Sequence, residues 1–173
     1  MMGSYAVNSG DALDRLANPL ARAQALTRES VAHCIPTLSA EDSVHDGMAQ
    51  RSAGHYLRLL VVDGRVVAAI EHRHGKKFDV GARKLKAERA LAQRAAAALR
   101  LGLAVIDVAR DADRPYVLGI SATPALGVLE RLTGARVAEA IIALIETRVR
   151  SWVRHSVPPA GPGAYGEEAN PQT

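Results

Sequence analysis

The residues best placed to do chemistry lie around two apolar segments in the middle of the chain, 103–109 and 116–120. The stretch 110–115 between them is charged and contains a proline, which favours a turn. We therefore expect an antiparallel strand pair with Asp107 near the end of its first strand. An acidic side chain at a strand end that faces a loop often holds a metal ion and phosphates. This run nevertheless carries fewer oxygen ligands than a magnesium site requires.

A hairpin is predicted upstream, over residues 56–70. Two apolar runs flank Asp63-Gly64, a two-residue loop that favours a type I′ turn because both residues tolerate positive φ. Arg58 lies in the first run and either faces a phosphate or acidic substrate or pairs with an acid. Asp107 is likewise either a metal ligand or a strand-end carboxylate bonded to loop amides or to a nearby arginine.

Histidines offer two weaker candidate sites. His72 and His74 are two residues apart, so on a strand they would share a face and could bind a metal ion. No third ligand lies near them in the sequence. His33 and Cys34 are adjacent, and neighbouring side chains on an extended chain point apart, which argues against a nucleophile pair.

Helical patterns surround these segments. An N-terminal helix capped by Ser9 or Asp11 precedes a second helix over about 20–32. An Ala-rich helix covers 82–100, a short helix ends at Gly134, and a long amphipathic helix follows.

These elements predict an α+β fold. A small antiparallel sheet from 56–71 and 103–121 would be covered on one face by the helices 84–100 and 137–153. The other face would be open, so a partner protein, self-association into a homo-oligomer or the N-terminal helices would have to cover it. We expect residues 1–53 to form a helical connector, 54–155 the main subdomain and 156–173 a disordered tail, because the tail is rich in Pro, Gly and polar residues.

Composition excludes several classes of protein. The chain has 173 residues and one cysteine, so it contains no internal disulfide and no Cys-based zinc cluster. Its net charge of +4 is spread along the chain without interleaved aromatics, which argues against nucleic-acid binding. No apolar run is long enough to span a membrane, and we expect a cytoplasmic protein.

From Tyr56 onward, the order of elements resembles the C-terminal part of the RimK-like ATP-grasp ligases. The segments that carry the resemblance are KLKAERALAQRAAAAL, AVIDVAR, TPALGVLERLTG and VAEAII, with a weaker match at VNSGDALDRL and CIPTL. The resemblance implies an enzyme that joins a carboxylate to an amine through an acyl phosphate made with ATP and magnesium. It places Arg58 at a retained arginine that would contact the cofactor.

The departures from this family are informative. The family has a strand-built subdomain with two lysines and a phosphate-binding loop where this chain has only the polar stretch between Thr37 and Gly54. The family's metal ligands are an aspartate and a Glu-x-Asn pair. Asp107 matches the aspartate, but Gly119 replaces the Glu and Ser121 replaces the Asn. The resemblance therefore leaves Asp107 and Ser121 as the candidate metal ligands.

Three hypotheses follow, and whether the chain is an enzyme stays open. It is a degenerate, internally shortened relative of these ligases with weak or lost catalysis. Alternatively, it is a non-catalytic scaffold subunit that docks a partner through the open sheet face. Thirdly, another chain supplies the missing subdomain and the ligase is still active.

Overall fold

The computed structural model describes residues 6–34, 55–73, 76–80, 85–112 and 114–156. The predicted polar connection 39–54, His74 and all but the first residue of the predicted tail lie outside these ranges. Within them, no helix combines the length with the apolarity that a membrane crossing requires.

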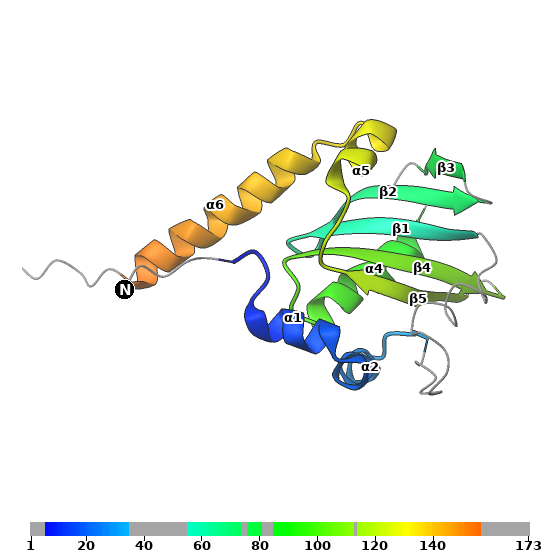
Figure 1. The fold of residues 1–173 in the computed structure, drawn as a ribbon, viewed down its shortest axis with the longest axis horizontal. Coiled ribbons are helices and arrows are strands. Elements are labelled where there is room, and N and C mark those ends of the chain that lie inside the picture. Colours follow the sequence, from blue (N-terminus) through cyan, green and yellow to red (C-terminus); the bar gives the residue numbers. More distant parts are fainter. Residues whose placement is uncertain (1–5, 35–54, 74–75, 81–84, 113, 157–173) are drawn as a thin grey trace, which may run out of the picture.

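A five-stranded antiparallel sheet forms the centre of the molecule (Figure 1), which confirms the α+β class. Its strand order is β3-β2-β1-β4-β5. The bounds are His55–Val62 for β1, Arg65–Arg73 for β2, Lys76–Asp79 for β3, Leu103–Asp111 for β4 and Arg114–Ser121 for β5.

Both predicted strand pairs are present. Asp63 and Gly64 have φ values of 48° and 71° at the β1–β2 turn, as the two-residue hairpin requires. The second pair is longer than expected, because β4 and β5 continue into the charged stretch that was predicted as their connection. Strand β3 was not predicted; its polar sequence pairs with β2 at the sheet edge.

One face of the sheet is covered by α4 (Lys86–Ala98) together with the N-terminal helices α1 (Gly10–Ala17) and α2 (Pro19–Arg28). Leu59 and Val61 of β1 point toward this face and join one core cluster with Ala92 and Ala95 of α4. Ser9 caps α1 by accepting a hydrogen bond from an amide of its first turn, as expected.

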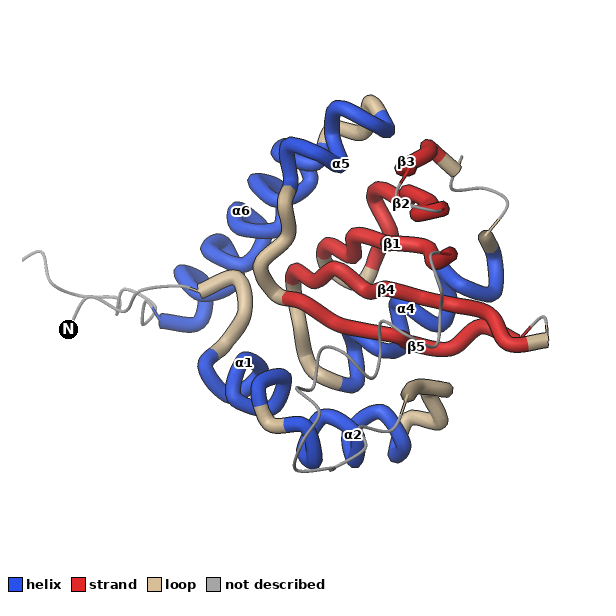
Figure 2. The backbone as a smooth tube through the Cα atoms, turned by 45° about the vertical axis from the view of Figure 1, so that its right-hand side comes forward, coloured by secondary structure: helices blue, strands red, loops and turns tan. Residues whose placement is uncertain are grey.

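The other face is covered by α5 (Leu126–Thr133) and the first half of α6 (Val137–Ser156) (Figure 2). Leu60 and Val62 alternate with the residues facing α4 and pack with Leu129, Val137 and Leu144. The expectation that both long helices cover one face was therefore wrong. Strand β1 is apolar on both sides, so each face needs its own covering helix.

The N-terminal segment is fastened to the start of β4. Asn8 Oδ1 accepts hydrogen bonds from the backbone amides of Gly102 and Leu103 at 2.8 and 3.0 Å, while Asn8 Nδ2 donates to the Leu103 carbonyl at 2.9 Å. Further on, Val117 in β5 forms an isolated parallel bridge with His33. These contacts attach the first helices to the sheet.

Candidate functional site

Strand pairing places Arg58 of β1 directly opposite Asp107 of β4. Arg58 Nε donates to Asp107 Oδ1 at 2.8 Å, and its NH2 group donates to Asp107 Oδ2 at 2.9 Å. This is the bidentate geometry that makes an Arg–carboxylate pair strong and directional. The two side chains are only 35% and 20% exposed. The structure thus places both candidate residues together, as partners of each other.

Aromatic rings flank this ion pair on the hairpin. Tyr56 and His72 face each other across β1 and β2, with ring centroids 4.4 Å apart and nearly parallel planes. The Arg58 guanidinium carbon lies 5.8 Å from the centre of the Tyr56 ring, within cation–π range. The Nε2 atom of His72 is buried and has no hydrogen-bond partner among the described residues.

The ion pair and its burial shift the ionisation of these groups. The hydrogen bond from Arg58 to Asp107 raises the pKa of the arginine above its ordinary value. Burial lowers the pKa of His72, and the positive charges of Arg58 and Lys77 lower it further. Burial also raises the pKa of Tyr56. His72 is therefore held neutral beside two cations.

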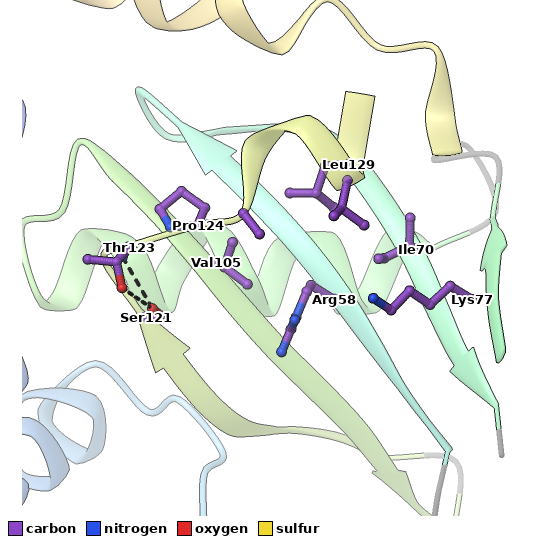
Figure 3. Close-up of a pocket in the computed structure, with 10 residues that line it drawn as sticks. Arg58, Ile70, Lys77, Val105, Ser121, Thr123, Pro124 and Leu129 are labelled. Atoms are coloured by element: carbon purple, nitrogen blue, oxygen red, sulfur yellow. Dashed lines mark hydrogen bonds between the residues drawn. The ribbon is translucent and has the colours of Figure 1, made fainter. Parts of the chain in front are cut away.

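A small cavity of about 170 Å³ opens next to Arg58 (Figure 3). Arg58 and Lys77 line one side of it and extend toward the same space. Ser121 and Thr123 line the other side, joined by a 3.2 Å hydrogen bond between their hydroxyl groups. The remaining walls are mainly apolar: Ile70, Val105, Pro124, Ala125, Val128 and Leu129. Lys77 and two hydroxyl groups around an apolar floor, beside a guanidinium that is already paired with Asp107, suit a small anionic group.

The donor set does not fit a magnesium ion. Asp107 pairs in register with Gly119, where a Cβ atom would meet Asp107 Oδ2 at 3.9 Å, so this position adjoins the carboxylate but supplies no oxygen ligand. Asp107 already binds Arg58 through both oxygens, and Ser121 binds Thr123. No group of three or more His, Cys, Asp or Glu side chains in the described ranges could hold a metal ion. The ligand roles of Asp107 and Ser121 and the cofactor role of Arg58 stay predictions.

Sequence reasoning missed two members of this site. Lys77 was not singled out, but β3 brings it opposite His72 and beside the cavity. His72 was considered only as a metal ligand, yet it stacks on Tyr56. His72 lies two residues after buried Ile70 on the same side of β2, and Lys77 pairs with it, but β3 is too short and polar to be recognised without the fold.

Comparison with protein families identifies the family. The model of the RimK-like ATP-grasp domain matches residues 44–145. Among curated relatives, a probable alpha-L-glutamate ligase of Sodalis glossinidius is 36% identical over 132 residues, which are 70% of this chain and 44% of the relative. A probable alpha-L-glutamate ligase of Serratia proteamaculans is 35% identical over 140 residues, or 73% of this chain and 45% of the relative. The chain thus spans less than half the length of these two relatives.

Solved structures show the same fold at low sequence identity. A D-alanine–D-alanine ligase from Bacillus anthracis superposes with a TM-score of 0.62 and 12% identity, covering 87% of this chain and 73% of that one. The ATP-grasp ligase PsnB, in a complex with a precursor variant, Mg and ADP, gives a TM-score of 0.59 and 17% identity, covering 83% and 62%. The α+β arrangement described above is shared with these ligases.

Proposed function

Because the chain belongs to the RimK-like ATP-grasp family, and so descends from ATP-dependent ligases, we propose that it no longer carries out ligation unaided. The observation behind this proposal is the Arg58–Asp107 ion pair. The carboxylate at the family's metal-binding position is engaged on both oxygens by a guanidinium. Its neighbours Gly119 and Ser121 offer at most one hydroxyl oxygen.

The chemistry of the reaction explains why this matters. In phosphoryl transfer from ATP, a divalent ion neutralises the charge that develops on the phosphates. Magnesium needs a near-octahedral oxygen set and is usually held by one or two carboxylates together with phosphates. A single carboxylate that is committed to an arginine is a poor basis for such a site.

Binding of ATP is a separate question from its turnover. The cavity beside Arg58 and Lys77 supports contact with a phosphate group, since the Lys77 side chain extends into it next to the paired guanidinium of Arg58. We place any retained nucleotide contact there and expect it not to depend on magnesium. The alternative role is that of a scaffold subunit. It would use the sheet face on which α5 and α6 pack, in the part around Arg58 and Tyr56.

The experiment that tests the proposal measures ADP release from ATP and magnesium, with glutamate as the amine. The purified chain is assayed alone and then with a complete ligase of the same family. We expect no ADP release by the chain alone. Sustained turnover that Asp107→Asn abolishes would contradict the proposal, whereas turnover that survives Asp107→Asn would point to a contaminating enzyme. Stimulation of the complete ligase would favour the scaffold role.

A further inference from the structure

The cavity beside Arg58 has a cation without a counter-charge among the residues that the structure describes. That cation is Lys77, which lines the cavity and has neither a hydrogen bond nor an ion pair with any of them. Its side chain extends toward Arg58 and the space between them (Figure 3). The Arg58 guanidinium, in contrast, is neutralised by the two hydrogen bonds that it donates to Asp107. The described charges at the cavity therefore leave one net positive charge, on Lys77.

Further groups that favour an anion lie on the opposite wall. The hydroxyl groups of Ser121 and Thr123 share one hydrogen bond, so one of their two hydroxyl hydrogens remains for a ligand. The adjoining wall is the first turn of α5, whose N-cap residue Ala125 provides no side-chain hydrogen bond. The partial positive charge at a helix N-terminus adds a modest attraction for negative charge. A carboxylate, with one charge and two oxygens, matches one ammonium and one hydroxyl donor.

The rest of the cavity is apolar and small. Ile70, Val105 and Leu129 line it and also belong to the core cluster of this sheet face. The cavity volume is about 170 Å³. An apolar cavity of about 150 Å³ holds a molecule of the size of benzene, which has about six non-hydrogen atoms. A carboxylic acid with a short aliphatic chain is of this size.

Charge and wall chemistry disfavour two other kinds of small anion. Inorganic phosphate carries close to two negative charges at neutral pH, which is more than one ammonium group neutralises. Its uncompensated charge would face apolar walls, so it should bind more weakly. An α-amino acid brings an ammonium group of its own near Lys77 and Arg58. The lining residues that the structure describes include no carboxylate to receive that group.

We infer that this cavity binds a small aliphatic monocarboxylate, whose charge is recognised by Lys77 and whose chain contacts the apolar walls. The inference rests on the proposed function in one respect, the placement of anion contact beside Lys77, and names the class of ligand. It requires no metal ion, and no covalent bond forms or breaks.

Titration of the isotope-labelled full chain with butyrate, followed by amide NMR shifts at constant ionic strength, tests the class of ligand. Butyrate should cause saturable shifts in the millimolar range around Thr123 and Val128. Butyramide has the same chain without the charge, and α-aminobutyrate adds an ammonium group. Each should bind at least about tenfold more weakly, because a hydrogen bond to a charged group is lost or a cation is left unpaired. Inorganic phosphate should also bind more weakly than butyrate.

Substitutions test the role of Lys77. Lys77→Met should weaken butyrate binding by about tenfold or more, because the carboxylate loses its counter-charge. Lys76→Met is the matched control, since Lys76 is the preceding residue of β3, is also exposed and points to the opposite face of the sheet. It should leave the affinity unchanged. Ala125→Leu narrows the cavity from an exposed position without altering any charge, and should also weaken binding.

The absence of saturable shifts with butyrate would overturn the inference. Equal binding of butyramide, tighter binding of phosphate, or equal weakening by Lys77→Met and Lys76→Met would do so as well. These outcomes are read without ATP and leave the proposed loss of ligation standing. ADP release by the chain alone would contradict that proposal and leave the butyrate result standing, so the two failures are distinguishable.

Discussion

Arg58 and Asp107 meet because antiparallel pairing of β1 with β4 leaves them directly opposite on the same face. Neither side chain is fully exposed, so the pair is better shielded from solvent than an ordinary surface salt bridge. Its removal leaves one charge without its partner. At the scale of the residue, this pair has a structural consequence that does not depend on ligation.

Asp107→Asn should lower the free energy of unfolding by about 1–3 kcal/mol, because it leaves a half-buried guanidinium without a counter-charge. Urea denaturation followed by circular dichroism measures the change. Asp111→Asn, at the exposed end of the same strand, is the control and should stay within about 0.5 kcal/mol of the unmodified chain. Equal stability of Asp107→Asn and the control would show that the ion pair contributes nothing.

Restoring the two absent ligands should create a divalent-ion site. A Cβ at Gly119 would make only ordinary van der Waals contact with Asp107, so the first side-chain carbon of Gly119→Glu is accommodated without backbone movement. With Ser121→Asn it adds a carboxylate and an amide oxygen beside Asp107. We expect Mn²⁺ to raise the melting temperature of the double variant by a few degrees and to leave the unmodified chain unchanged. Stabilisation of both proteins alike would mean that Mn²⁺ binds elsewhere.

His72 should make stability depend on pH. Its pKa in the folded chain is below its ordinary value of 6.5, because it is buried and lies near Arg58 and Lys77. Between the folded and unfolded pKa values the unfolded chain binds more protons, so stability is fully present above pH 6.5 and falls as the pH drops toward the folded pKa. Denaturation at pH 7.5 and pH 5.5, about a unit either side of the unperturbed value, should show a smaller loss for His72→Gln than for the unmodified chain. An identical loss in both would contradict this role of His72.

At the scale of the element, the docking of α4 on the sheet depends on a second ion pair, between Glu88 and Arg110. Glu88 is 1% exposed and accepts hydrogen bonds from Arg110 of β4, the one from Nε at 2.5 Å. A buried carboxylate is tolerated only with such a partner.

Arg110→Ala should therefore destabilise the fold by roughly 2–4 kcal/mol, since Glu88 would be left buried and unpaired. Adding Glu88→Gln should recover part of the loss, because the buried charge is then removed. Arg94→Ala, on the exposed face of α4, should change little. Thermal or urea unfolding of the four proteins decides between these outcomes, and a double variant no more stable than Arg110→Ala alone would argue against a charge effect.

Much of the fold could be predicted at the element scale, since local chemistry determined it. The Asp63-Gly64 turn fixed the hairpin, and Gly134 ends α5 in the left-handed conformation with φ 64°. The covering of the sheet could not be predicted, because a run such as LRLLVV is apolar at both alternating positions and does not say which helix lies on which face. The pattern of the long amphipathic helix does not identify its core side either, since Trp152 near its end is 52% exposed.

The candidate site was predicted in part. Resemblance to the family placed Asp107 and Ser121 near one another, and they lie on neighbouring strands of one sheet. The ion pair itself depends on the register of β1 against β4, which separates its members by 49 positions in the chain. From the sequence alone, an ion pair could be stated only as one of two alternatives for Arg58 and one of two for Asp107.

At the scale of the whole molecule, the chain belongs to the RimK-like ATP-grasp family and forms one five-stranded sheet with a small cavity beside Arg58. The cavity is lined by Lys77 next to Arg58, whereas Asp107, the carboxylate proposed for the metal position, is already paired with Arg58. Anion binding and metal-dependent chemistry are therefore separate properties of this one site.

Calorimetric titration with ATP, in the presence of magnesium and in its absence, tests this separation most directly, with Asp107→Ala run alongside. The account predicts that magnesium does not strengthen ATP binding and that Asp107→Ala does not introduce or remove any magnesium effect. An affinity that rises tenfold or more with magnesium, about 1.4 kcal/mol, and loses that gain in Asp107→Ala would show a working metal site and contradict the central claim.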